Sequence, residues 1–333
     1  MIRPPAFWWT RPPSLLARML APFAAIYGAL TLRRMRQPGH RAGCPVVCIG
    51  NFTVGGAGKT PTAILIARML LERGHSPVFL SRGYGGTLKG PVMVDPARHG
   101  ASEVGDEPLL LVRTAPVIVS ADRVAGAQWA RQAGASIIIM DDGLQNPSLH
   151  KDLVVAVIDG GSGFGNGMVF PAGPLRSSVD GQAASVHVAL VIGGGDGVCA
   201  AVLPQGLDVI EGEMRVPGEA AARIKGQRVL AMAGIALPEK FVRTLEGCGA
   251  IVTSRHFVAD HAPYTAADLD LVAGKAKAGH ALVATTEKDA ARMGSDIPPV
   301  LVARLVVVPV VLEITSGHDR LGEWLDELVA DPA

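Results

Sequence analysis

Cysteine and unbalanced charge are both scarce in this chain of 333 residues. It contains four cysteines, none of them in a C-x-x-C pair, and its formal net charge is only +1. A structural zinc site needs several such ligands close together, so zinc is a weak interpretation and reduced cytosolic thiols are the default. A broad nucleic-acid surface needs an excess of basic residues, so we expect no nucleic-acid partner.

The apolar run near the N-terminus is too short for an ordinary membrane span. Residues 19–32 carry no charge, whereas a helix that crosses a bilayer needs about 20 apolar residues. Arg33, Arg34 and Arg36 follow the run and suit anionic lipid headgroups. We expect residues 1–40 to form a helix that associates with a membrane surface. A helix that only packs on the main domain and a true span are the alternatives.

What the chain does have is a regular alternation of strand and helix patterns. The first apolar run, at 45–51, is followed by a glycine-rich loop and a helical pattern over 59–73. Further strand-like runs lie at 77–81, 117–120, 136–142, 153–159 and 188–194. Continuous apolar strands separated by helices are typical of parallel sheets buried on both faces. We therefore predict an α/β fold, with a mostly parallel sheet like that of P-loop NTPases and helices on both faces.

The pattern breaks between about 206 and 226 and then starts again. We predict a kinase domain that binds nucleotide over 41–225 and a smaller α/β domain over 226–305. Residues 306–333 are expected to form a return strand and a C-terminal helix at 319–328, which packs on the first domain.

A phosphate-binding loop is predicted between the first strand and the first helix of this series. The stretch T-V-G-G-A-G-K-T-P-T spans residues 53–62. Glycines let successive backbone N–H groups surround an anion, and the following helix N-terminus adds partial positive charge. The strict pattern G-x-x-x-x-G-K-[ST] has glycine at position 53, where this chain has threonine. Nucleotide contacts are expected from Thr53, Val54, Gly55, Gly56, Ala57, Gly58, Lys59, Thr60 and Pro61.

The expected cofactors are ATP and Mg²⁺. In such loops the lysine, here Lys59, reaches the β- and γ-phosphate oxygens, and the hydroxyl of Thr60 faces the metal ion. An acid at the end of a neighbouring strand completes the metal shell, and Asp141 and Asp142 follow the apolar run that begins at 136. Adjacent strand residues point to opposite faces, so these two aspartates are expected to differ in role.

Two other classes of phosphate-loop protein lack support. GTPases read guanine with N-K-x-D, but in T-E-K-D at 286–289 the lysine and aspartate are adjacent. Transporter ATPases carry L-S-G-G-Q, which is absent from the sequence. GTP specificity and transport are therefore not indicated.

An ordered set of motifs closely resembles the tetraacyldisaccharide 4′-kinase family. The resemblance extends from the N-terminal helix to about Asp289. Its motifs are, in order, T-V-G-G-A-G-K-T-P, S-R-G-Y-G-G, G-D-E-P, D-D-G-L-Q, G-N-G-M-V-F-P-A-G-P-L-R, D-H and T-E-K-D. It implies a kinase at the cytoplasmic face of the bacterial inner membrane. Its substrate would be an acylated glucosamine disaccharide 1-phosphate lipid phosphorylated at the 4′-hydroxyl, with no obligate protein partner.

The resemblance also implies roles for individual residues. Asp106 would be the catalytic base, and Lys59 would neutralise charge on the transferred group. Asp141 and Glu107 would join Thr60 at the metal. His261 would pair with Asp142, bringing the second domain to the site.

Substrate contacts implied by the resemblance come from Tyr84, Arg82, Arg176 and Asn166. Two positions depart from the family pattern, which usually has histidine where this chain has Asn146 and often glutamate where it has Ser177. The alternative function is that of a metallochaperone or regulatory NTPase acting on a protein partner. The lack of a Cys/His metal cluster in the sequence disfavours it.

Overall fold

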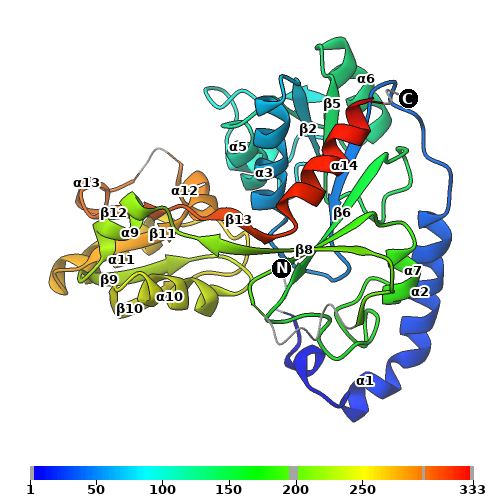
Figure 1. The fold of residues 1–333 in the computed structure, drawn as a ribbon. Helices are drawn as coiled ribbons and strands as arrows, with labels where there is room; N and C mark the ends of the chain where they lie inside the picture. Colours follow the sequence, from blue (N-terminus) through cyan, green and yellow to red (C-terminus); the bar gives the residue numbers. More distant parts are fainter. Residues whose placement is uncertain (1–3, 195–201, 295–296, 331–333) are drawn as a thin grey trace.

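The structure is a computed structural model that describes residues 4–194, 202–294 and 297–330. Its larger sheet has, in the described residues, the strand order β13-β8-β7-β6-β1-β5-β2-β4-β3 (Figure 1). The strands are β1 (Val46–Gly50), β2 (Pro77–Ser81), β3 (Val92–Met93), β4 (Val117–Val119), β5 (Ile137–Asp141), β6 (Leu153–Asp159), β7 (Val188–Ile192), β8 (Asp208–Arg215) and β13 (Val311–Ser316). All neighbouring strands pair in parallel except the two edge strands β3 and β13.

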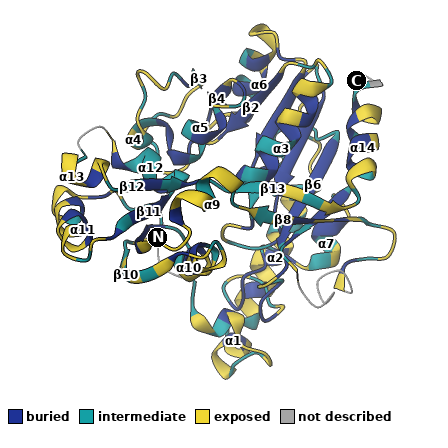
Figure 2. Ribbon diagram, turned by 60° about the vertical axis from the view of Figure 1, so that its left-hand side comes forward, coloured by how far each residue is buried: buried dark blue, intermediate teal, exposed yellow. Residues whose placement is uncertain are grey.

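Helices cover both faces of this sheet, as the buried apolar strands predict. On one face lie α3 (Lys59–Glu72), α5 (Asp106–Leu111) and α14 (His318–Ala330), whose buried side chains join one core cluster. On the other face α6 (Arg123–Gln132) packs against the central strands, and α7 (Val179–Ala183) closes a second cluster. The central strands and the inner faces of these helices are buried (Figure 2). The α/β fold with a mostly parallel sheet is confirmed.

A smaller parallel sheet lies beside the first, with the order β10-β9-β11-β12. Its strands are β9 (Arg228–Ala233), β10 (Ile251–Phe257), β11 (Leu282–Thr286) and β12 (Leu305–Val308). Its two core clusters contain side chains of α9 (Gly218–Ile224) and α10 (Pro238–Gly247) in one, and of α11 (Ala266–Ala278), α12 (Glu287–Met293) and α13 (Pro299–Val302) in the other. This sheet carries α12 against α5 of the larger sheet.

Two sequence-based expectations about strands are corrected. The break expected at 206–226 contains β8, which pairs with β7 and with β13. The return strand expected from residue 306 begins later, because residues 305–308 form β12 of the small sheet and only β13 joins the large one. Residues 309 and 310 join these strands, and proline at 309 has no N–H to donate to a ladder. The chain therefore returns to the large sheet through β13, and α14 packs there as expected.

The N-terminal segment forms η1 (Ala6–Trp9), α1 (Leu15–Met19) and α2 (Ala21–Met35). In the part of the chain that the structure describes, no helix combines the length and apolar character needed to cross a bilayer. Many residues of α1 and α2 are nevertheless exposed (Figure 2), and they include a row of large apolar side chains. We call it the apolar helix face; its members are Leu15, Leu16, Met19, Phe23, Ile26, Tyr27 and Leu30.

Candidate active site

The phosphate loop connects the end of β1 to the start of α3. Gly55 and Gly58 have φ values of +119° and +95°, and a Cβ at Gly58 would lie 2.7 Å from Cδ1 of Ile192. The positive φ therefore favours glycine at position 58, while the nearby ends of Ile192 and Met214 could move aside for a side chain. The side-chain amide of Asn51 donates to the carbonyl oxygen of Gly55 at 2.9 Å. This hydrogen bond ties the backbone of the loop to the residue that follows β1.

The loop offers donors to an anion. Among the described residues, the backbone N–H groups of residues 55–58 make no hydrogen bond. Lys59 is the first residue of α3, and its Nζ lies 3.4 Å from the carbonyl oxygen of Gly55 and 3.5 Å from Oδ1 of Asp142. Free amides, a lysine and a helix N-terminus form the arrangement that binds phosphate groups.

Asp141 and Asp142 lie beside this loop because β5 pairs with β1, with Asp141 opposite Ile49. Asp142 has a φ of +50° and turns away from the strand, where it also meets Nη2 of Arg176 at 3.4 Å. Burial works to raise the pKa of Asp142, but Lys59 and Arg176 outweigh it and the pKa falls below its ordinary value. Asp142 is therefore a fixed negative charge between two cations.

Asp141 is buried, and in the described part of the chain its carboxylate forms no ion pair, although the charges of Lys59 and Lys288 act on it from further away. Its Oδ1 has no hydrogen-bond partner among the described residues. Burial, together with the charges of Glu107 and Asp142, raises the pKa of Asp141 to about 7. A buried carboxylate oxygen without a partner is costly, and a divalent cation would remove that cost. The two adjacent aspartates thus have different surroundings, as their strand position predicts.

Residues near Asp141 suit Mg²⁺. Thr60 is buried, and its Oγ1 lies 3.5 Å from Oε1 of Glu107, at the start of α5. In the described residues, no group of three or more His, Cys, Asp and Glu side chains is placed to hold a metal ion by itself. Mg²⁺ in phosphoryl-transfer sites is bound by one or two carboxylates, phosphate oxygens and water, so two acids and a hydroxyl are sufficient. The donor set of Thr60, Glu107 and Asp141 fits this ion.

A carboxylate–imidazole pair joins the two sheets at this site. Asp106 begins α5, while His261 lies in the loop after β10, and His261 Nδ1 is 3.1 Å from Asp106 Oδ2. The expected pairing of His261 with Asp142 is therefore wrong. Asp142 instead faces Lys59 and Arg176, because its left-handed backbone turns it toward the phosphate loop.

The electrostatics of the pair favour an ionised Asp106. Burial works to raise its pKa, but the close contact with His261 and the charges of Lys288 and Arg292 bring the pKa below its ordinary value. The contact with the Asp106 carboxylate in turn raises the pKa of His261, against the effect of burial. Asp106 is thus a carboxylate held by cations, with one imidazole fixing its orientation.

The expected substrate residues fall into different places. Tyr84 is half-exposed and its ring centroid lies 5.5 Å from that of His261. Arg82 is exposed nearby in the same loop. A Cβ at Gly105 would lie 2.5 Å from the carbonyl oxygen of Tyr84, so glycine lets this loop approach α5. Arg176 lies at the phosphate loop, where its Nε donates to the carbonyl oxygen of Thr53 at 3.2 Å.

Asn166 does not fit the expected substrate role. Its side chain is buried and donates to the carbonyl oxygens of Phe7 and Ala172, at 3.3 Å and 3.0 Å. Its Oδ1 accepts from the backbone N–H of Met168 at 3.0 Å. All its polar atoms thus hold the 163–177 loop and the N-terminal segment together.

The two departures from the family pattern have structural partners. Oδ1 of Asn146 accepts from the backbone N–H of Ser148 at 2.8 Å and closes a turn. Ser177 is buried, and its hydroxyl donates to the carbonyl oxygen of Gly28 in α2 at 2.9 Å. Position 177 therefore ties the N-terminal helix to the strand-end loop that carries Arg176.

Sequence reasoning missed several charged residues at the site. Lys288 Nζ lies 2.6 Å from Glu107 Oε1, and Arg292 Nε lies 3.5 Å from Asp106 Oδ2. Both lie on α12, one helical turn apart. Arg123 at the start of α6 is buried and donates to the carbonyl oxygen of Ser120 at 3.1 Å. Arg123 could have been predicted as a site residue because it follows strand β4 closely. Lys288 and Arg292 could not, because the residues that they contact are far away in the sequence.

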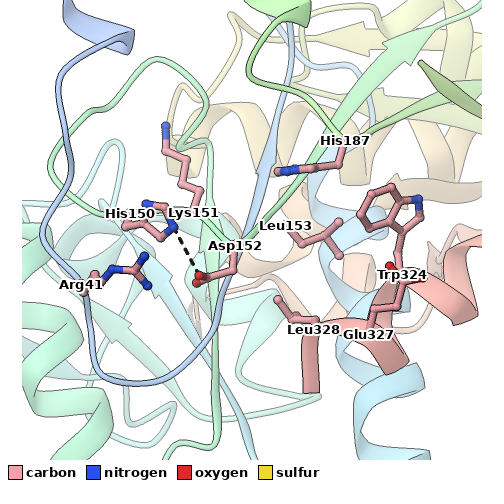
Figure 3. Close-up of a pocket in the computed structure, with 9 residues that line it drawn as sticks. All are labelled: Arg41, His150, Lys151, Asp152, Leu153, His187, Trp324, Glu327 and Leu328. Carbon is pink, nitrogen blue, oxygen red and sulfur yellow. Dashed lines mark ion pairs between the residues drawn. The ribbon is translucent and has the colours of Figure 1, made fainter. Parts of the chain in front are cut away.

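A separate pocket lies at the amino-terminal end of β6, away from the carboxyl ends of the strands that carry the phosphate loop (Figure 3). Its lining includes His187, whose ring centroid lies 5.5 Å from that of Trp324 of α14, and the ion pair of His150 and Asp152 at 3.4 Å. None of the predicted site residues lines it. The chemistry therefore concentrates at the carboxyl ends of the strands, as it does in other open α/β sheets.

The geometry at the strand ends defines a class of protein. Free amides and a lysine suit the phosphates of a nucleoside triphosphate, and an ionised carboxylate beside them suits an alcohol that must lose a proton. The molecule is a phosphotransferase of the phosphate-loop class.

Comparisons with known proteins identify the family. The chain belongs to the tetraacyldisaccharide-1-P 4′-kinase (LpxK) family, the lipid A 4′-kinases, whose family model matches residues 16–330. It is 54% identical over 295 residues to a tetraacyldisaccharide 4′-kinase of Methylobacterium radiotolerans, covering 88% of this chain and 90% of the relative. It is 47% identical over 331 residues to a tetraacyldisaccharide 4′-kinase of Rhodopseudomonas palustris, covering 98% and 97% of the two chains.

A solved structure has the same fold. The crystal structure of the "apo" form of LpxK from Aquifex aeolicus in complex with ATP superposes with a TM-score of 0.73. It shares 20% sequence identity and covers 95% of this chain and 100% of its own. The resemblance noted from the motifs is thus confirmed. The metallochaperone or regulatory NTPase alternative gains nothing from these findings.

Proposed function

We propose that this kinase transfers the γ-phosphate of ATP to the 4′-hydroxyl of a tetraacylated glucosamine disaccharide 1-phosphate. Membership of the lipid A 4′-kinase family supports the reaction, and the relatives' names give the substrate class. The observation that carries the mechanism is the Asp106–His261 contact of 3.1 Å beside the phosphate loop. It puts a proton acceptor from α5 and an orienting imidazole from the second sheet at one place.

In this proposal the protein's groups divide the work of phosphoryl transfer. Lys59 and the amides of 55–58 bind the phosphates and balance charge on the transferred group. Thr60, Asp141 and Glu107 would hold Mg²⁺, which when bound supplies positive charge to the phosphate oxygens. Asp106 accepts the proton of the attacking sugar hydroxyl, while His261 holds the carboxylate in position. Asp142, fixed by Lys59 and Arg176, keeps the lysine aimed into the loop.

The substrate is expected to approach over Tyr84 and Arg82. Tyr84 is half-exposed at the edge of His261, so its ring can lie against a sugar while remaining close to the base. Arg82 is exposed in the same loop and offers a bidentate donor to the 1-phosphate. Arg176 is held by Asp142 and Thr53, so we propose it for the nucleotide side of the site.

We further propose that the enzyme works as a peripheral protein at the cytoplasmic face of the bacterial inner membrane. The apolar helix face exposes Phe23 and Ile26 by 64% and 62%, and α2 ends in Arg33 and Arg34. Apolar side chains with adjacent arginines suit insertion into an anionic lipid surface. An acylated substrate stays in the bilayer because each buried CH₂ is worth roughly 0.8 kcal/mol.

The two sheets support a proposed division of the chain into working units. The bounds of 41–225 and 226–305 expected from the sequence move, because α9 packs in the core of the small sheet and β12 belongs to that sheet. The nucleotide unit would extend over 41–217 and the smaller unit over 218–308, with 309–330 returning to the first. Residues 1–40 would be the membrane-associated segment. Because His261 comes from the smaller unit and Asp106 from the larger, closure between the units would complete the base.

A direct assay tests the proposal. Purified protein is mixed with γ-labelled ATP, Mg²⁺ and acylated disaccharide 1-phosphate in detergent micelles, and labelled lipid is separated and counted. We expect labelled lipid only when ATP and the protein are both present. Tight nucleotide binding without any labelled lipid would remove the proposed activity.

A further inference from the structure

Arg292 lies between Asp106, the proposed base, and the loop that carries His261. Its side chain is only 6% exposed, and it projects from α12 of the small sheet. On one side, Nε lies 3.5 Å from Oδ2 of Asp106. On the other, Nη1 donates to the carbonyl oxygen of Ala262 at 3.3 Å and Nη2 to that of Gly234 at 2.8 Å. Ala262 follows His261 directly, so one guanidinium contacts Asp106 and the loop of its partner.

The carbonyl oxygen of Gly234 links Arg292 to His261 a second time. It accepts from the backbone N–H of His261 at 3.1 Å as well as from Arg292. His261 has a φ of +58°, a left-handed conformation that costs free energy for a residue with a side chain. That backbone persists only if neighbouring bonds hold it. Arg292 binds two carbonyl groups next to this strained residue: that of Ala262, which follows His261 in the chain, and that of Gly234, which accepts the backbone N–H of His261.

The guanidinium of Arg292 is also held by an ion pair within its own helix. Its Nη2 pairs with Asp289, a fully buried carboxylate of the same helix. Asp289 also accepts from the backbone N–H of Gly234 and from the hydroxyl of Tyr264, each at 2.8 Å. Asp289 is the last residue of the T-E-K-D motif, and these contacts give that motif a structural reason. A planar guanidinium with this many fixed partners has one orientation.

We infer that Arg292 is a positioning residue that holds His261 against Asp106 when the small sheet docks on the large one. This inference rests on the proposed role of Asp106 as the base. Besides its 3.5 Å contact with Oδ2 of Asp106, Arg292 fixes where the imidazole lies relative to that carboxylate. Lys288 supports the same docking one turn earlier, through its contact of 2.6 Å with Glu107.

Two substitutions test the inference. Arg292→Lys keeps the charge beside Asp289, but an ammonium cannot span Asp106, Ala262 and Gly234 together. Arg292→Gln removes the charge as well. We expect kcat to fall at least fivefold for Arg292→Lys and at least twentyfold for Arg292→Gln, with the KM for ATP changed less than threefold. Arg304→Gln is the matched control, because Arg304 lies in the same unit and its side chain, among the described residues, donates to the carbonyl oxygen of Ala281 and to no residue of the site.

The decisive readout is the same substitution made in a His261→Ala background. If Arg292 acts through His261, Arg292→Lys costs less than a further twofold there. An equal loss in both backgrounds, or a wild-type kcat for Arg292→Lys, overturns the inference. Should Arg292→Gln fail to fold, as a lower Tm and lost ATP binding would show, Arg292→Lys decides alone. Full activity of His261→Ala with an inactive Asp106→Asn would instead contradict the proposed pairing, which separates the two failures.

Discussion

Nδ1 of His261 lies 3.1 Å from Oδ2 of Asp106, although Asp106 begins α5 of the large sheet, His261 lies in a loop of the small sheet, and the two are 155 positions apart in the chain. Asp106 is 3% exposed, so the imidazole is a large part of its surroundings. A carboxylate with this environment is ionised, oriented and sheltered from water. The contact makes catalysis dependent on how the two sheets dock.

Asp141→Asn should stabilise the free enzyme in a pH-dependent way. The pKa of Asp141 is about 7, above the ordinary carboxyl value, so the folded state holds this proton more tightly than the unfolded chain. The free energy of unfolding therefore falls as pH rises from about 4 to 7, and the penalty is complete above pH 7. Removing it should stabilise the protein by up to about 4 kcal/mol at pH 8.

Urea unfolding at pH 5 and pH 8 in the presence of a chelator measures this effect. The difference between Asp141→Asn and wild type should be larger at pH 8, while kinase activity is lost. A variant that is equally stable at both pH values relative to wild type would mean that Asp141 is not strained in the free enzyme. Asp152→Asn is a control, since Oδ2 of Asp152 accepts a hydrogen bond from the backbone N–H of Val46.

Replacing Phe23 and Ile26 together by serine should release the enzyme from lipid. Both side chains are exposed on α2, so the change removes apolar surface without opening the core. Burial of one such side chain is worth roughly 1.5–3 kcal/mol, so vesicle affinity should fall at least tenfold. Sedimentation with anionic vesicles measures it. The matched pair Val300→Ser and Val302→Ser on α13 should bind like wild type; equal binding by both pairs would contradict membrane docking through α2.

Asn166→Ala should lower stability and leave substrate affinity unchanged. The buried amide bonds three backbone groups, and its loss leaves the carbonyl oxygens of Phe7 and Ala172 without this donor. The expected cost is about 1–3 kcal/mol. Thermal unfolding and the KM for the lipid acceptor report the two quantities. A raised KM at unchanged Tm would restore the substrate role that the motif suggested.

Lys59→Ala should weaken ATP binding and lower kcat together. Lys59 is the cation of the phosphate loop and one of the two that hold Asp142. Its loss removes charge from the bound phosphates and from the transferred group alike. Calorimetric titration with ATP and steady-state assays measure both effects. A normal dissociation constant with a lowered kcat would limit Lys59 to the transition state.

Local patterns predict most of the large sheet. The strands at 46–50, 77–81 and 153–159 are short, apolar and followed by turn residues, and each is buried where expected. β8 was not predicted because its sequence, D-V-I-E-G-E-M-R, is not a continuous apolar run: exposed residues alternate with more buried ones, and it contains a glycine. Such a strand is defined by its neighbours β7 and β13, which a linear pattern does not show.

Strand patterns alone predicted the part of the candidate site that lies at strand ends, whereas Asp106, Glu107 and His261 came from the family resemblance. The phosphate loop follows β1 and Asp141 ends β5, and adjacent parallel strands bring their carboxyl ends together. The partner of His261 depends on docking between two sheets, so its assignment to Asp142 failed. Arg292 gives no signal, since arginine in the last turn of a helix is usually solvated.

Phosphoryl transfer by Asp106→Asn tests the central claim most directly. Labelled phosphate from ATP is followed into the acylated disaccharide 1-phosphate, and ATP binding is measured on the same preparation. With Asp106 as the base, kcat should fall by about 10²-fold or more while the dissociation constant for ATP changes less than threefold. A variant that binds ATP normally and transfers phosphate at the wild-type rate would contradict the account.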